Sequence, residues 1–184
     1  FVIQNSADGI AALGSGGGAL GYAANPVFPN LPGISNSLAI EFDLWDNTGD
    51  WNDFTSRQHI SVQCRGLLAN LPDAGSSMAH FVGGPDLSDG LIHTGSIQYV
   101  NGTLNVFVDL NQVLSAPIDL STELALTSGQ AYVGLTASTG SLTNVERHEL
   151  ISWDFNVIPN PASAAVLAGA AIGLLALRRT RPFA

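Results

Sequence analysis

The feature that most constrains the fold is a succession of short apolar runs, which glycine, asparagine, aspartate, serine and proline interrupt every few residues. No run before residue 157 keeps the 3.6-residue period of an amphipathic helix. The runs are rich in valine, isoleucine, phenylalanine and tyrosine, which favour strands. We therefore predict an all-β antiparallel sandwich over residues 1–156. The expected strands are Ser37–Leu44, His59–Val62, Gly95–Val100, Thr103–Leu110, Ala131–Ser138 and His148–Val157.

The clearest local signal is a hairpin. Two apolar runs, 97–100 and 103–108, flank Asn101 and Gly102. Asparagine and glycine best tolerate the positive φ angles that a two-residue type I′ turn requires. We expect these two strands to pair directly.

Charge is sparse and mostly negative. Charged residues make up 11% of the chain, against about 25% in typical soluble domains. Residues 1–156 hold three arginines and all fifteen acidic residues, which leaves a net charge of −12. Nucleic-acid binding needs clustered cationic charge, so nucleic acid is excluded as a partner. The single cysteine, Cys64, allows no internal disulfide and is interpreted as a small buried hydrophobe. His80 and His93 are isolated, and no functional role is expected for them.

Residues 157–184 differ from the rest of the chain. After Pro159-Asn-Pro161 come sixteen uncharged residues, 162–177, and then three arginines among residues 178–181. This length is near the lower limit for crossing a bilayer, and an arginine cluster tends to remain cytoplasmic. We expect a C-terminal hydrophobic helix that anchors the protein in a membrane with its acidic domain outside. The alternative is an alanine-rich helix packed on that domain.

The segment that is most indicative of a functional site is 37–47, because it contains closely spaced acidic residues. In a strand alternate side chains share a face, so the apolar residues of 38–44 point into the core while Glu41 and Asp43 lie side by side on the other face. Two carboxylates about 7 Å apart repel each other unless a cation lies between them. The following loop ends at His59; oxygen donors suit Ca²⁺, and an added imidazole suits an ion such as Mn²⁺. The loop's other donors are Asn47, Asp50, Asn52 and Asp53. The alternative is a solvated acidic strand edge.

Three motifs in order resemble legume-type (L-type) lectins. The acidic segment 37–47, with His59-Ile-Ser-Val62, resembles the family's metal-binding segment. Phe1–Ile10, which contains Ala7-Asp-Gly9, and the Gly17–Tyr22 loop resemble its Ala-Asp-Gly motif and glycine loop. Residues 131–155 resemble its specificity loop and final strand.

The resemblance covers most of residues 1–156. It implies a concanavalin A-like jelly roll, truncated because the family has further strands before the Ala-Asp-Gly motif. It also implies carbohydrate binding without catalysis, with glycans as partners. If the missing strands pair beside His148–Val157, that edge is open and homo-oligomers can form.

The same resemblance implies two cations, Ca²⁺ and a Mn²⁺-like transition ion. The transition-metal ligands would be Glu41, Asp43, Asp53 and His59. The calcium ligands would be Asp43, Asn47, Asp53 and the backbone carbonyl of Trp45. Because the loop differs in length from the family's pattern, Asp50 could replace Asp53.

The implied sugar site comprises Asp8, Gly18 and Asn47, together with backbone groups of the 141–147 loop, including Ser141 and Leu142. In the family the peptide bond before the aspartate is cis. An aromatic side chain stacking on the sugar is also expected, and the candidates are Trp51, Phe54 and Tyr22.

The tail resembles the PEP-CTERM class of bacterial C-terminal sorting signals, with Pro159-Asn-Pro161 in place of Pro-Glu-Pro. This implies a bacterial protein at the cell surface, sorted or anchored through residues 157–184.

Glu41–Asp46 also resembles the active strand of laminarinase-type retaining glycoside hydrolases, which reads Glu-x-Asp-x-x-Glu. That mechanism needs two carboxyl groups about 5–5.5 Å apart. Asp46 in place of glutamate shortens the reach by roughly 1.5 Å and leaves the proton donor poorly placed. We therefore predict a protein that is not an enzyme. The alternatives are this hydrolase and a structural or adhesive surface protein with a degenerate sugar site.

Overall fold

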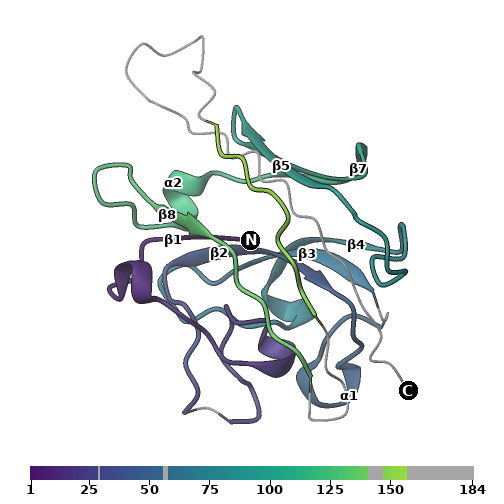
Figure 1. Cartoon of the computed structure of the whole chain (residues 1–184). Helices are drawn as coiled ribbons and strands as arrows, with labels where there is room; N and C mark the ends of the chain where they lie inside the picture. The colour runs from purple at the N-terminus through teal and green to yellow at the C-terminus, as the bar shows by residue number, and fades with distance from the viewer. Residues whose placement is uncertain (29, 56–57, 141–146, 157–184) are drawn as a thin grey trace. The chain divides into compact units, whose positions relative to one another are not determined.

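A computed structural model describes residues 1–28, 30–55, 58–140 and 147–156 (Figure 1). It is mostly antiparallel β-sheet with very little helix, which confirms the all-β prediction. The chain divides into two compact units. The first comprises Phe1–Gly83 and Leu120–Glu146, and the second comprises Gly84–Asp119 and Arg147–Ala184.

The first unit contains a five-stranded antiparallel sheet in the order β4-β3-β2-β1-β8. Its strands are β1 (Val2–Gln4), β2 (Ser37–Asp43), β3 (His59–Cys64), β4 (Ser77–Val82) and β8 (Tyr132–Gly134). Strand β2 lies at the centre, and its register with β3 places Glu41 opposite Ser61 and Asp43 opposite His59. The two ends of the 43–59 loop therefore meet across one strand pair.

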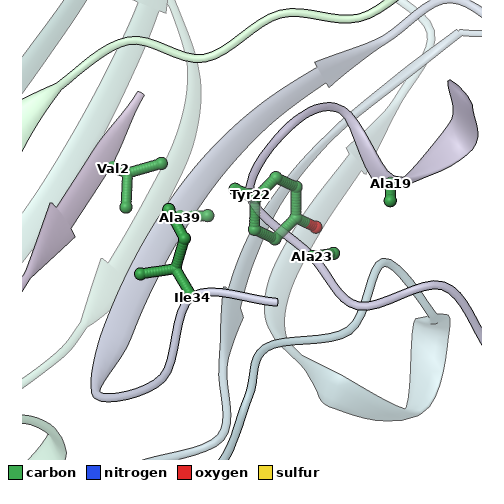
Figure 2. Packing of buried hydrophobic residues seen from close by; sticks show 6 residues of the cluster. All are labelled: Val2, Ala19, Tyr22, Ala23, Ile34 and Ala39. Carbon is green, nitrogen blue, oxygen red and sulfur yellow. The ribbon is translucent and has the colours of Figure 1, made fainter. Parts of the chain in front are cut away.

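Both faces of β2 are buried. Leu38 and Ile40 are fully covered on one face, as predicted, but Glu41 and Asp43 on the other face are only 3% and 4% exposed. Ala39 shares their face and belongs to an apolar cluster (Figure 2). The members of this cluster are Val2, Ala19, Tyr22, Ala23, Ile34 and Ala39. The acids are therefore buried, and the alternative of a solvated acidic edge does not apply.

Short helical turns lie in the loops of the first unit: η1 (Gly9–Ala11), η2 (Gly17–Ala19), α1 (Thr48–Trp51), η3 (Ala74–Ser76) and α2 (Leu120–Glu123). The segment of residues 14–22, which we call the glycine loop, folds closely on itself. A Cβ on Gly14 would lie 2.3 Å from the backbone carbon of Tyr22, so no larger residue fits there without rearrangement. The loop supplies Ala19 and Tyr22 to the apolar cluster.

The second unit contains a three-stranded antiparallel sheet of β5 (Gly95–Val100), β6 (Thr103–Val108) and β7 (Asn111–Pro117). Asn101 and Gly102 have φ angles of 51° and 74°, as the predicted hairpin turn requires. On β6 every second residue is buried, which is the period of a strand with one covered face.

Some strand predictions were wrong. The strand expected over Ala131–Ser138 is reduced to Tyr132–Gly134, and residues 148–156 form no strand. Alternating apolar residues favour a strand, but a strand forms only where a neighbour pairs with its backbone groups. Among the described residues, no helix is long and apolar enough to cross a membrane. The C-terminal helix expected over residues 162–177 lies outside the described residues.

Candidate metal centre and glycine loop

Asp43, Asp53 and His59 converge beyond the end of β2. One ligand atom from each residue lies within 4.8 Å of the others, and all three residues are buried. Asp43 and His59 meet through the β2–β3 register, while Asp53 comes from the loop after α1. The structure thus brings Asp53 to the predicted centre; the side chain of Asp50 lies outside what it describes. We call Asp43, Asp53, His59 and Glu41 the acid cluster.

Backbone groups of the loop orient the carboxylates. The N–H of Trp45 donates to Asp43 Oδ1 at 2.8 Å, and the N–H of Phe54 donates to Asp53 Oδ1 at 2.7 Å. The N–H of Asn47 donates to Asp53 Oδ2 at 3.3 Å. Three backbone N–H groups of the loop therefore hold the two aspartates, which fixes both carboxylates relative to β2.

Glu41 is satisfied entirely by protein donors. Its Oε2 accepts from Tyr22 Oη at 2.5 Å, and its Oε1 accepts from Gln63 Nε2 at 2.9 Å and from the Ser61 hydroxyl. His59 Nε2 lies 3.2 Å from the same Oε1. Burial raises the pKa of Glu41, but hydrogen bonds from these four side chains outweigh it, so the net pKa is lowered. Glu41 is therefore an ionised carboxylate at neutral pH.

The neighbouring acids shift the other way. Burial and then repulsion by Glu41 raise the pKa of Asp43 to about 7, although the Trp45 N–H opposes the shift. Burial likewise raises the pKa of Asp53. The pKa of His59 is lowered by burial but raised more by Glu41 and both aspartates, so its net shift is upward. The cluster carries more negative charge than its own donors offset, which is the condition that a bound cation relieves.

Unpaired buried atoms also point to a cation. Within the described residues, Asn47 Oδ1 and His59 Nδ1 are buried without a hydrogen-bond partner. Leaving such a group unpaired costs about 1–3 kcal/mol. Two carboxylates, an amide oxygen and an imidazole are ligands for Ca²⁺ and for transition ions. The residues present therefore fit a bound cation.

The glycine loop lies against Asn47. A Cβ on Gly18 would lie 2.8 Å from Asn47 Oδ1 and 3.3 Å from Trp51 Cζ3, so only glycine allows this approach without displacing a neighbour. The hydroxyl of Ser138 donates to the carbonyl of Gly17. The structure thus brings together Gly18 and Asn47, two predicted sugar-site residues. Ser141 and Leu142, which follow Ser138 closely in sequence, lie outside the described residues.

Asp8 is not brought to this place. Gln4 Nε2 donates to the carbonyl of Gly9 at 2.8 Å, which keeps the η1 turn beside the Gln4 end of β1. Gln4 pairs with Ser37 at the start of β2, whereas Asp43 ends that strand. At 3.3 Å per residue, Ser37 and Asp43 are about 20 Å apart along the strand. No described residue follows a cis bond, so the bond before Asp8 is trans. The cis bond implied by the resemblance is thus not present.

The three aromatic candidates have different surroundings. Tyr22 is buried with its hydroxyl on Glu41, so it cannot stack on a sugar. Phe54 lies between His59 and His80, with ring centroids 4.8 and 4.4 Å away. Trp51 borders Gly18. Trp45, whose carbonyl alone was predicted to act, is 47% exposed and becomes a fourth candidate.

Sequence reasoning missed the donors that surround Glu41. Ser61 and Gln63 follow His59 at alternate positions on β3 and so share its face. Once His59 is placed opposite Asp43, that period of two identifies both residues. Tyr22 carried no comparable signal, because it reaches Glu41 from a loop.

Comparison with known proteins identifies the family. The family model of the legume lectin domain matches residues 1–168. No curated protein and no solved structure gives a significant match. The match spans both sheets and every residue of the acid cluster and the glycine loop. Proteins with this domain bind carbohydrate and are generally not enzymes. The chain belongs to the legume lectin domain family.

Proposed function

We propose that this protein binds glycans, without catalysis, at a site built on Gly18 and Asn47 beside a cation-loaded acid cluster. The observation that carries the proposal is the close approach of Gly18 to Asn47, whose buried Oδ1 has no hydrogen-bond partner among the described residues. An amide has two ends, so Asn47 can direct its oxygen to a cation and its NH₂ to a sugar hydroxyl.

Asp43, Asp53 and His59 would hold the cations together with Asn47 and the carbonyl of Trp45. The ions that we propose are Ca²⁺ and a Mn²⁺-like ion, and Glu41 would add negative charge beside them. When bound, they supply positive charge that offsets the buried carboxylates and fixes the orientation of Asn47. The chain's own residues do the rest: Gly18 lets the glycine loop approach Asn47 closely, and Trp51 or Trp45 offers an apolar face to a sugar.

Backbone groups around Ser141 and Leu142 would set sugar preference. Supporting this, Thr136 Oγ1 donates to the carbonyl of Leu20 at 2.9 Å and Ser138 donates to that of Gly17, so the chain leading to the 141–147 loop lies along the glycine loop.

The hydrolase alternative fares poorly against the geometry. A glycosidase nucleophile must reach the sugar, but Glu41 is 3% exposed and accepts hydrogen bonds from four side chains. Asp46, the would-be acid, is exposed beyond the end of β2. We expect no reducing-end release from β-glucans or galactans, with or without chelator.

We also propose that the protein acts at the cell surface, anchored through its tail. This rests on the uncharged run 162–177 and the following arginines. Deleting residues 159–184 should move the protein from the membrane fraction to the soluble or secreted fraction. A parent protein found wholly soluble would contradict the anchor.

A glycan array tests the sugar site. The parent should bind a defined set of glycans in Ca²⁺ and Mn²⁺ and lose them in chelator. Asn47→Ala should abolish the signal. Gly18→Ala should weaken it, because the new Cβ would meet Asn47 Oδ1.

Two controls make this test specific. Gly16→Ala lies in the same loop, and its added Cβ would meet nothing within 4 Å, so binding should persist. Asp8→Ala should also bind like the parent, because Gln4, which bonds the turn after Asp8 through the Gly9 carbonyl, pairs with the start of β2 rather than its Asp43 end. Loss of binding in Asp8→Ala with Asn47→Ala unaffected would overturn the proposed location.

A further inference from the structure

We propose that Tyr22 is a positioning residue that ties the glycine loop to the acid cluster, so that a cation bound at the cluster orders the loop carrying Gly18. The inference rests on the proposed cation site and deepens it. It identifies a route between the two sites besides the direct contact of Gly18 with Asn47.

The side chain of Tyr22 contacts both the apolar cluster and the acid cluster. Its ring is 2% exposed and lies in the apolar cluster with Ala19, Ile34 and Ala39 (Figure 2). Its hydroxyl donates to Glu41 Oε2 at 2.5 Å. A buried hydrogen bond to a carboxylate is directional and stronger than a neutral one, so the ring and the acid constrain each other.

A displacement of Tyr22 would shift the rest of the glycine loop, because backbone hydrogen bonds connect its residues. The N–H of Gly14 donates to the carbonyl of Gly21 at 2.8 Å, and the N–H of Gly21 donates to that of Ser15 at 2.9 Å. The N–H of Leu20 closes the turn over Gly18 by donating to Gly17 at 3.0 Å. Because Gly14 also contacts the Tyr22 backbone without room for a Cβ, the loop and the tyrosine form one compact piece.

Glu41 also contacts His59, which is a predicted metal ligand. His59 Nε2 lies 3.2 Å from Glu41 Oε1 and 3.3 Å from Asp53 Oδ1. A cation held by His59 and Asp53 would fix His59 beside Glu41, and Glu41 in turn accepts the hydrogen bond of the Tyr22 hydroxyl. Tyr22 contacts no cation and no sugar in this scheme, so it acts only through Glu41.

Hydrogen exchange measured with the metals alone tests the inference. Full chain, stripped by chelator and then given Ca²⁺ and Mn²⁺, should show slower amide exchange both at residues 43–59 and in the glycine loop. We expect a change of about tenfold or more in the loop, within the range of coupled sites. In Tyr22→Phe, calorimetry should still detect cation binding and residues 43–59 should still be protected. The cation should then change loop exchange only about twofold or less.

Tyr132→Phe is the matched control, because it removes a hydroxyl from a tyrosine outside the cluster, and it should behave like the parent. A purely structural role for Tyr22 would raise loop exchange equally with and without metal, leaving the ratio unchanged; that result overturns the inference. If the parent binds no cation and residues 43–59 are not protected, the proposed cation site itself fails. The two failures are therefore distinguishable.

Discussion

The two units of the protein each contain a histidine between two carboxylates, and the two clusters behave in opposite ways. In the second unit, His93 Nδ1 lies 2.7 Å from Asp109 Oδ2, and Nε2 lies 3.1 Å from Asp89 Oδ1. In the first unit, His59 Nε2 lies near both Glu41 and Asp53, while its Nδ1 is buried and has no partner among the described residues. Both ring nitrogens of His93 therefore have a partner, whereas among the described residues only one ring nitrogen of His59 does.

The pKa values of the carboxylates also differ between the two clusters. Burial raises the pKa of Asp109, but its hydrogen bonds with His93 and the Thr94 N–H together outweigh burial and lower the pKa overall. Asp43, by contrast, has its pKa raised to about 7 by burial and by Glu41. Histidine and carboxylates alone therefore do not mark a metal centre. The mark is a buried excess of negative charge with ligand atoms left unpaired.

The largest difference should follow removal of one carboxylate from each cluster. Glu41→Leu leaves four side-chain donors buried without their acceptor and should lower the free energy of unfolding by about 3–5 kcal/mol. Asp109→Leu removes a carboxylate whose side chain is 38% exposed and should cost about 1 kcal/mol or less. Urea unfolding measures both, and Glu41→Gln should fall between them. Equal losses for the two leucine variants would remove the distinction.

A second difference should appear in the pH dependence of the cation-free protein. The folded-state pKa of Asp43 is about 7, whereas an unfolded aspartate titrates near 3.9, so the folded state holds the extra proton between these values. Stability in chelator should fall as pH rises from about 4 to 7, by up to about 4 kcal/mol from this group. Asp43→Asn should flatten the profile. A parent profile that rises over this range and is unchanged in Asp43→Asn would contradict the assignment.

The smallest effect concerns His93. Burial lowers the pKa of His93, but hydrogen bonds with Asp109 and Asp89 raise it more, so its net pKa lies above the usual value. Its contribution to stability is present below an unfolded pKa of about 6.5 and is lost as pH rises through the folded value, a change of about 1 kcal/mol or less. His93→Gln should remove that change while leaving cation binding intact. Comparing urea midpoints of the two proteins between pH 5 and 8 detects it.

Local signals in the sequence predicted part of the fold. Strand β5 and the start of β6 were placed correctly because Asn101 and Gly102 specify the turn between them. Strand β4 was missed: it is an edge strand whose alternate residues are exposed, so apolar content does not set it apart. The expected strand over His148–Val157 had the right alternation, but strand formation depends on a partner that the sequence does not identify.

The candidate site also contains residues that the sequence predicted and residues that it did not. Asp43 and His59 were predicted as donors because alternation on β2 and the following loop place them within a short stretch, whereas the family resemblance singled out Asp53 from the other donors of that loop. The place of Asp8 and the role of Tyr22 could not be predicted, because both depend on how loops cross the sheet. Tertiary contacts, such as the bond of Gln4 to Gly9 and that of Tyr22 to Glu41, decide those paths.

Thermal melting of the metal-stripped protein, with and without added Ca²⁺ and Mn²⁺, tests most directly whether a cation completes the acid cluster. The parent and Asp109→Asn should both gain about 3 kcal/mol at cation concentrations near a hundred times Kd. Asp43→Asn should gain much less, because it loses a carboxylate ligand. If the stripped parent melts at the same temperature in chelator and in excess cation, or if Asp43→Asn gains as much as Asp109→Asn, the cluster is not a cation site.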